Sequence, residues 1–262
     1  MSLTRRLATV AASLLTLATT TAALAQAPDW KKVRIGVEGA YPPFSEVGTD
    51  GKIKGFDIDI AYALCAEMKA ECTLVAQEWD GMIPALQARK FDAIIASMAI
   101  TEERKKSVAF TDKYYNTPAW LIGKAGLTDQ SPAAWKGKKI GVQRTTTHDR
   151  YVTQYYKDSE IVRYAKQDEI FLDLAAGRID GALQDSVAAD LGFLKKPAGK
   201  PFARIGPPID DPVIFGIGSG IALRKTDTAL LEKFNAAIKA IRANGTYKKI
   251  QDKYFDFDIY GK

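Results

Sequence analysis

Residues 91–115 read FDAIIASMAITEERKKSVAFTDKYY, and this stretch decides the fold because an apolar strand there runs into a polar helix start. The run 91–98 is short, almost continuously apolar and bounded by charge, which is typical of a parallel strand covered on both faces. Thr101 is a predicted helix N-cap, and Glu102 and Glu103 suit the positive end of the helix dipole. The segment therefore predicts a buried strand that leads directly into a helix.

Arg104 does not fit this helix start. A cation is disfavoured near the positive end of a helix, so an arginine here indicates an anion held between the guanidinium and free backbone N–H groups. The alternative, judged from this segment alone, is a surface arginine in the charged run 102–106.

The rest of the chain repeats the alternation of strand and helix. Its 262 residues exceed the usual size of one domain, so we expect two lobes, and the alternation favours parallel α/β layers. The predicted strands are 33–37, 73–77, 93–98, 139–142, 161–164 and 181–183. The predicted helices are 57–68, 79–89, 149–157, 168–176, 187–194 and 227–243.

Residues 1–25 have the features of a secretory signal peptide. Arg5 and Arg6 precede an apolar, uncharged stretch that ends in a small-x-small cleavage pattern at Ala25. The arginine pair lacks the rest of a twin-arginine pattern, so we expect ordinary export, cleavage after Ala25 and a periplasmic location. No later stretch offers the roughly 20 apolar residues that a membrane span needs.

The charge of the mature chain gives little support to nucleic-acid binding. Without the two signal-peptide arginines, 35 Lys and Arg stand against 31 Asp and Glu, a formal charge of +4. The basic residues are interleaved with acids rather than gathered into one stripe with aromatics.

Cys65 and Cys72 both lie in the exported part, where oxidising conditions allow a disulfide, and we expect them to pair. Two buried free thiols are the alternative. A metal site has less support, because His148 is the only histidine in the chain.

The two halves of the chain contain similar segments. KVRIGV at 32–37 resembles KKIGV at 138–142, and LQARKFDA at 86–93 resembles LAAGRIDG at 174–181. Each pair opens and then closes a similar βαβ unit. Two lobes built alike would place the carboxyl ends of both sheets around one cleft, where open α/β folds bind ligands.

Several segments together carry a family resemblance: RIGVE at 34–38, YPPF at 41–44, GFDIDI at 55–60, WDGMIP at 79–84, residues 92–104, the Cys-x6-Cys spacing and the tail 245–256. With these, the mature chain resembles the periplasmic amino-acid-binding proteins of ABC importers, solute-binding protein family 3, most closely the lysine/arginine/ornithine and histidine branch. The resemblance implies a type II periplasmic binding protein fold, with two α/β lobes joined by two crossover strands that close on a ligand. It implies lobe 1 over 26–116 and 217–262, and lobe 2 over 117–216.

The resemblance also implies ligand contacts at the charged positions. Arg104 matches the family arginine that takes the α-carboxylate of the ligand, helped by backbone N–H groups near Ala99 and Thr147. Asp185 matches the aspartate that holds the α-ammonium, although from its sequence position alone it is a strand-end or N-cap acid. Glu38 matches an acidic position that meets the distal cation, with a solvated turn acid as the alternative.

Aromatic residues complete the implied site. Tyr41 and Trp79 match a pair that sandwiches the ligand side chain, for which core packing is the alternative. The predicted ligand-binding set is Glu38, Tyr41, Trp79, Ala96, Ser97, Met98, Ala99, Arg104, Gln143, Thr146, Thr147, His148 and Asp185.

The chain departs from the lysine/arginine branch where that branch has three serines, because it has Ala96-Ser97-Met98-Ala99 there. Ala99 removes a hydroxyl to which the α-ammonium would donate a hydrogen bond, and Trp79 replaces a smaller aromatic. Similar changes occur in relatives that bind opines, which are arginine derivatives with a substituted α-nitrogen. The expected ligand is therefore arginine, ornithine, lysine, histidine or an arginine derivative such as an opine.

Two further features have alternatives. His148 follows the predicted carboxylate-binding turn, where it either lines the pocket and tunes pH dependence or is solvated. The glycine-rich run 216–220 suggests a phosphate loop, but it lacks the following lysine, so we favour a crossover hinge that returns the chain to lobe 1.

Three functions are compatible with the sequence. The first is a monomeric transport receptor that binds a small amino acid without cofactor or metal and delivers it to the membrane permease of an ABC importer. The second is an enzyme on the same fold, similar to the periplasmic cyclohexadienyl dehydratases. The third, a sensor module of a signalling receptor, is disfavoured because no membrane span follows.

Overall fold

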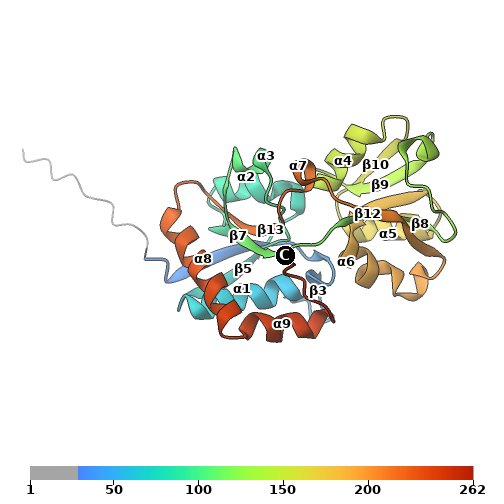
Figure 1. The fold of residues 1–262 in the computed structure, drawn as a ribbon. Helices are drawn as coiled ribbons and strands as arrows, with labels where there is room; N and C mark the ends of the chain where they lie inside the picture. Colours follow the sequence, from blue (N-terminus) through green and yellow to red (C-terminus); the bar gives the residue numbers. More distant parts are fainter. Residues whose placement is uncertain (1–28, 262) are drawn as a thin grey trace, which may run out of the picture.

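The computed structural model describes residues 29–261, which form two α/β lobes side by side (Figure 1). The predicted signal peptide lies outside the described residues. The sheet of lobe 1 has the order β5 (Glu71–Ala76), β1 (Lys32–Val37), β6 (Ala93–Ile94), β13 (Ser219–Leu223), β7 (Ala109–Tyr115). The sheet of lobe 2 has the order β10 (Glu160–Tyr164), β9 (Lys139–Gln143), β11 (Gly181–Asp185), β8 (Ala119–Lys124), β12 (Phe202–Ile209). A small antiparallel sheet in lobe 1 consists of β2 (Ala40–Tyr41), β3 (Ser45–Val47) and β4 (Ile53–Lys54).

Helices cover these sheets. Lobe 1 contains α1 (Phe56–Glu67), η1 (Trp79–Gly81), α2 (Met82–Gln87), α3 (Glu102–Lys105), α8 (Thr228–Ala243) and α9 (Thr246–Tyr254). Lobe 2 and its connection back to lobe 1 contain η2 (Pro132–Trp135), α4 (Thr147–Tyr155), α5 (Gln167–Ala175), α6 (Ser186–Ala189), η3 (Asp190–Leu194), η4 (Pro197–Gly199) and α7 (Pro212–Phe215).

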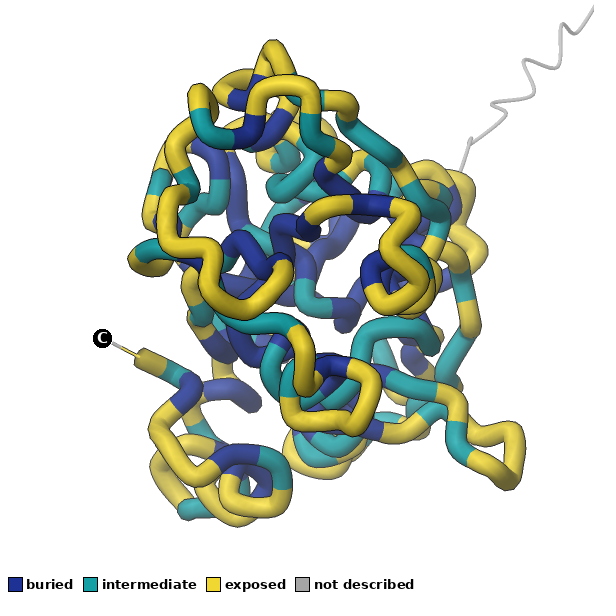
Figure 2. Tube along the Cα trace, turned by 90° about the vertical axis from the view of Figure 1, so that its right-hand side faces the viewer, coloured by how far each residue is buried: buried dark blue, intermediate teal, exposed yellow. Residues whose placement is uncertain are grey.

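Each large sheet is buried on both faces, as the apolar strand sequences predict. In lobe 1, Phe234 of α8 belongs to one core cluster, whereas Met82 of α2 belongs to a second. In lobe 2, Val152 of α4 and Ile170 of α5 likewise belong to two separate clusters. Figure 2 shows the same distribution, with buried segments inside and exposed residues on the outer loops. Strands β1, β5 and β6 run parallel, so their carboxyl ends meet at one edge.

Two connections join the lobes (Figure 1). The chain leaves lobe 1 through residues 116–118, between β7 and β8, and returns through residues 210–218, between β12 and β13. The proposed lobe boundaries fall within these connections. The return passes Gly216, whose φ is 76° and where a Cβ atom would lie 2.0 Å from the carbonyl oxygen of Ile100. Glycine is required there by backbone conformation and space rather than by a phosphate.

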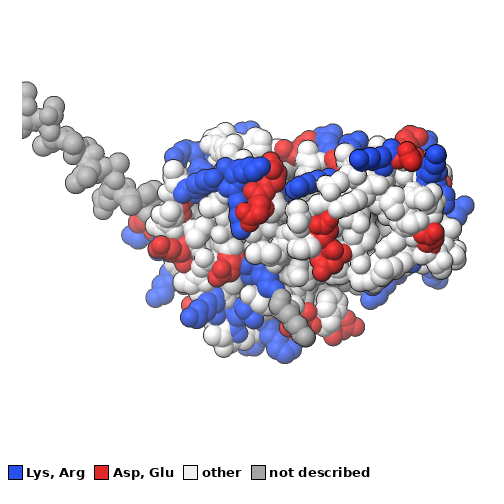
Figure 3. Space-filling view, turned by 45° about the horizontal axis from the view of Figure 1, so that its top comes forward, with Lys and Arg blue, Asp and Glu red and all other residues white. Residues whose placement is uncertain are grey.

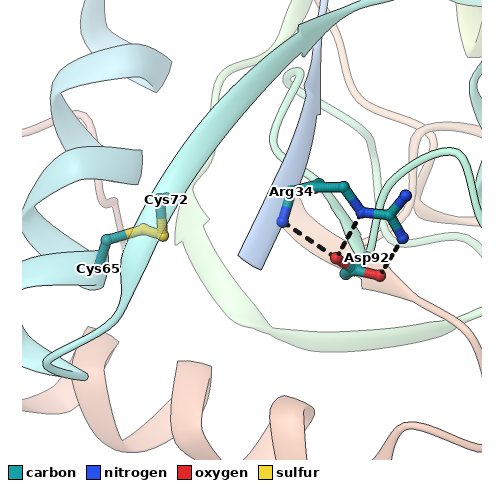
Figure 4. The surroundings of a disulfide bond; sticks show 4 residues. All are labelled: Arg34, Cys65, Cys72 and Asp92. Carbon is teal, nitrogen blue, oxygen red and sulfur yellow. Dashed lines mark hydrogen bonds and ion pairs between the residues drawn. A yellow bond between two sulfur atoms is a disulfide. The ribbon is translucent and has the colours of Figure 1, made fainter. Parts of the chain in front are cut away.

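Two tertiary links stabilise lobe 1 (Figure 4). Cys65 of α1 and Cys72 of β5 form a disulfide, which confirms the predicted pair. Arg34 of β1 donates its backbone N–H and two guanidinium N–H groups to Asp92, at 2.9–3.1 Å, and so ties β1 to the segment that precedes β6.

Three predicted elements are wrong in extent. The strand predicted over 93–98 ends at Ile94, because Ser97 has a φ of 56° and its N–H pairs with the Tyr114 hydroxyl instead of a strand. The helix predicted over 79–89 is divided into η1 and α2, and that over 187–194 into α6 and the π-helical η3. The prediction missed α9 and the strands β2, β3, β4, β7, β8, β12 and β13.

Surface charge is mixed, and Figure 3 shows basic and acidic side chains interspersed on the face that it draws. Among residues 29–261, none of the helices combines the length and apolarity that crossing a bilayer requires. The same residues contain no group of three or more His, Cys, Asp and Glu side chains that could hold a metal ion.

Candidate ligand-binding site

A cavity lies between the two lobes. Its walls come from both lobes and lie near the carboxyl ends of β1, β5, β6, β9, β10 and β11, as open α/β folds predict. The lining residues are Glu38, Tyr41, Trp79, Ala96, Ser97, Ala99 and Arg104 from lobe 1, and Gln143, Thr146, Thr147, His148, Gln167 and Gln184 from lobe 2.

Arg104 presents a positive charge to this cavity. The Thr101 hydroxyl accepts from its backbone N–H at 3.2 Å, which confirms the predicted N-cap of α3. The guanidinium donates to the Ala99 carbonyl at 3.1 Å and lies 5.1 Å from the centre of the Trp79 ring. Among residues 29–261 no carboxylate forms an ion pair with it, and burial lowers the pKa of Arg104 to about 10. The group is therefore charged at neutral pH, with donors left for an anion.

The start of α4 lies on the same cavity from the lobe 2 side. The Thr146 hydroxyl caps this helix, because it accepts from the Asp149 N–H at 3.1 Å and donates to the Gln143 carbonyl at 2.7 Å. Thr147 is the first residue of the helix, so its N–H has no acceptor inside the helix. The guanidinium of Arg104 and the positive end of α4 together favour a carboxylate between them.

His148 lines the cavity and packs on Phe215, with ring centres 5.6 Å apart. Burial lowers the pKa of His148 to about 4, and the positive charge of Arg104 contributes. The imidazole is therefore neutral at neutral pH and adds hydrogen-bonding atoms without charge.

Glu38 is buried directly after β1 and places a carboxyl group in the cavity wall. It accepts a hydrogen bond from the Gln143 amide at 2.7 Å, which crosses from lobe 2 to lobe 1. Burial raises the pKa of Glu38 to about 7, although the Gln143 bond opposes this and Asp168 adds to it. Within the described residues Glu38 has no ion-pair partner, so it is suited to a cationic ligand group.

The lobe 1 wall supplies aromatic and hydroxyl groups. Tyr41 and Trp79 both line the cavity, and Trp79 also belongs to the core cluster beneath Arg104. Ser97 donates its hydroxyl proton to Asp57 at 2.9 Å, and the Tyr114 hydroxyl donates to the same carboxyl at 3.0 Å. Because its proton is used in this way, the Ser97 oxygen is left as an acceptor for an ammonium group.

Two predicted residues are absent from this cavity. Met98 is buried in the core, because the positive φ of Ser97 turns the backbone just before it. Asp185 lies in an adjoining hollow that shares five residues with the main cavity: Tyr41, Ser97, Ala99, Thr147 and His148. Its carboxylate caps α6 by accepting from two backbone N–H groups at 2.9 and 3.0 Å, and it also accepts from the Thr117 hydroxyl. The structure therefore gives Asp185 the contacts of an N-cap.

Sequence reasoning missed Gln167 and Gln184, which both line the cavity. Gln167 is the first residue of α5 after β10, just as Thr147 is the first residue of α4 after β9. This equivalence between strand-to-helix positions is the signal that could have found it. Gln184 lies near the carboxyl end of β11, where the same rule for parallel strands applies.

Two α/β lobes around a polar cavity define a solute-binding protein. The model of the bacterial extracellular solute-binding proteins, family 3, matches residues 33–257, and the chain belongs to this family. It is 56% identical over 234 residues to the L-arginine-binding protein of Pseudomonas aeruginosa, which covers 88% of this chain and 90% of that protein.

Two further matches agree with this assignment. The chain is 44% identical over 260 residues to the histidine-binding periplasmic protein of Salmonella typhimurium, with 98% and 99% coverage. A solved Salmonella typhimurium periplasmic binding protein, described for its high arginine specificity, matches with a TM-score of 0.81 and 37% identity, over 86% of this chain and 99% of that one. These findings confirm the family and the two-lobed fold, and they are consistent with a solute-binding protein rather than an enzyme.

Proposed function

We propose that this protein captures arginine or a related cationic amino acid in the periplasm and delivers it to the permease of an ABC importer. One observation carries the proposal. Arg104 and Glu38 line the same cavity, and neither forms an ion pair within residues 29–261. A free guanidinium and a free carboxyl group in one enclosed site are complementary to a ligand with both a carboxylate and a distal cation.

The proposed pose follows from these charges. The α-carboxylate binds Arg104 and the N–H of Thr147 at the start of α4. The α-ammonium donates to the Ser97 oxygen and points toward the hollow that contains Asp185. The ligand side chain passes the rings of Tyr41 and Trp79 and ends at Glu38.

The relatives support a ligand of this class. The L-arginine-binding protein of Pseudomonas aeruginosa shares 56% of its aligned residues with this chain. Ala99 itself contributes no hydroxyl to the boundary between the cavity and the Asp185 hollow, so an opine with a substituted α-nitrogen belongs to the proposed ligand class.

Calorimetry on purified protein freed of ligand tests the proposal with L-arginine, L-ornithine, L-lysine and L-histidine. Arg104→Ala should weaken binding of these ligands by about 2–5 kcal/mol, as expected when a buried charge pair loses one partner. Lys105→Ala is a matched control, because Lys105 is exposed on the same helix and pairs only with Glu102. Near-native affinity of Arg104→Ala would contradict the proposed site.

Export after cleavage at Ala25 and action as a monomer belong to the same proposal. Cell fractionation and the intact mass of the exported chain test the cleavage site. Light scattering with and without ligand tests the oligomeric state. Receptor-dependent stimulation of a reconstituted permease tests delivery.

A further inference from the structure

Two buried glutamines in the cavity wall have hydrogen-bonding capacity that the protein does not use. Gln167 and Gln184 are each 1% exposed and both line the cavity. Among residues 29–261, neither amide nitrogen has a hydrogen-bond partner. Gln143 differs, because its amide nitrogen donates to Glu38 at 2.7 Å and to the Ala165 carbonyl at 3.0 Å. A buried donor without a partner is costly, so the two free amides indicate that the ligand completes them.

The fold gathers these amides on one wall. Strand β11 pairs with β9 in parallel, so Gln184 and Gln143 approach the carboxyl ends of neighbouring strands. Strand β10 lies on the other side of β9 and leads to Gln167, two residues after the carbonyl that Gln143 contacts. Gln143 also contacts Glu38, and the amides of lobe 2 line the same cavity as the carboxyl of lobe 1.

The chemistry of this wall differs from that of a site made only for a cation. A guanidinium has five N–H donors and no acceptor, so it can satisfy Glu38 but not the amide donors. The terminal group of a ureide or a carboxamide has both kinds of atom. Its N–H groups can donate to Glu38, while its carbonyl accepts from an amide nitrogen.

We propose that Gln167 and Gln184 form, together with Glu38, a subsite for a neutral carbamoyl group. The protein then also binds amino acids whose side chain ends in a ureide or carboxamide. This inference rests on the proposed function, because it assumes that the α-carboxylate binds Arg104.

L-Citrulline is the probe, because it has the length and shape of L-arginine but has an oxygen in place of one guanidinium nitrogen. Calorimetry should detect citrulline binding to the wild-type protein, weaker than arginine because the ion pair with Glu38 is lost. Gln167→Met and Gln184→Met keep the side-chain length and remove the amide. Each should weaken citrulline binding about fivefold to tenfold, the usual value of one hydrogen bond, and arginine binding less than threefold.

Gln251→Met is the matched control. Gln251 is also a buried glutamine, but it accepts from the Ile259 N–H at 3.2 Å in the C-terminal segment and does not line the cavity. It should leave the affinities for both ligands unchanged. If a methionine variant does not fold, Gln184→Glu replaces it, since glutamate has the same size but loses the amide donors, and it should lower the affinity for citrulline relative to that for arginine.

The outcomes separate the two proposals. Wild-type protein that binds arginine but not citrulline overturns the carbamoyl subsite and leaves the arginine site intact. The carbamoyl subsite is also overturned if the methionine variants lose affinity equally for both ligands, or lose none. Wild-type protein that binds neither ligand overturns the proposed function itself.

Discussion

Arg144 of lobe 2 and Asp80 of lobe 1 form an ion pair across the cleft, with 2.6 Å between the Arg144 Nε and the Asp80 Oδ2 atoms. The neighbouring residue Gln143 donates to Glu38 across the same cleft at 2.7 Å. Separation of the lobes would break both contacts. They therefore stabilise the closed arrangement, in which the cavity walls from both lobes come together.

Loss of this ion pair should favour the open state. The two side chains are 43% and 33% exposed, so water and salt screen them and the pair contributes only about 0.2–1 kcal/mol. Arg144→Gln and Asp80→Asn should each speed ligand dissociation by roughly 1.5-fold to fivefold, measured by stopped-flow fluorescence. The difference in dissociation rate from wild type should shrink in about 0.5 M salt, because salt screens exposed charges.

Arg178→Gln is the control for this experiment. It removes a comparable ion pair with Asp173 that lies entirely within lobe 2. If Arg178→Gln speeds dissociation as much as Arg144→Gln does, the effect comes from net charge and the interlobe contact has no particular role.

Glu38 should make arginine binding depend on pH. Burial raises its pKa to about 7 in the unliganded site, and only the ionised form pairs with a distal cation. Arginine affinity should therefore fall as the pH decreases from 8 to 5.5. Glu38→Gln should weaken arginine binding sharply and flatten its dependence on pH. It should barely change the binding of neutral glutamine. Equal losses for arginine and glutamine would contradict a cation site at Glu38.

The same group should affect the stability of the ligand-free protein. The folded-state pKa of Glu38 lies above its ordinary value of 4.5, so the native state binds more protons between about pH 4.5 and 7. Stability should fall as the pH rises through this window, on the order of 2–3 kcal/mol for Glu38, and then level off. Burial also raises the pKa of Asp57 to about 7, so Glu38→Gln should remove only part of the slope in urea titrations. An unchanged slope would show that Glu38 is ionised throughout.

The disulfide should support lobe 1 without affecting ligand choice. Cys65 and Cys72 lie on α1 and β5, and neither lines the cavity. Thiol titration of the denatured, unreduced protein should find no free thiol. Reduction should cost about 2 kcal/mol and lower the melting temperature by roughly 4–8 °C, with the order of ligand affinities unchanged. Two reactive thiols before reduction would contradict the pairing.

Ala99 should control tolerance of a substituted α-nitrogen. It borders both the main cavity and the Asp185 hollow, and its carbonyl accepts from Arg104. Ala99→Ser should increase the affinity for free arginine by about threefold to tenfold, because the hydroxyl gives a primary ammonium one more hydrogen-bond partner. The same hydroxyl should clash with the substituted α-nitrogen of octopine or nopaline and weaken their binding. Parallel changes for both ligand classes would argue against this role.

Much of the site could be predicted because it lies at strand ends. Glu38 follows β1, Trp79 follows β5 and Gln143 ends β9, and parallel strands bring their carboxyl ends to one edge. For Arg104, the cation beside the N-cap Thr101 indicated a bound anion but left a surface arginine as the alternative, and the family resemblance favoured the binding role. Local patterns of burial, capping and charge contain this information, so the sequence by itself determined the α/β layers and the polarity of the cleft.

Other features depended on contacts between distant segments. Met98 turns into the core because Ser97 takes a positive φ and bonds to Tyr114, seventeen positions further along the chain. Asp185 acts as a helix cap, although its sequence position allowed either role. Gln167 and Gln184 stand near strand ends, but they become neighbours in one wall only because β9, β10 and β11 lie side by side. These outcomes required the tertiary structure, because backbone torsions and partners from another part of the chain decide them.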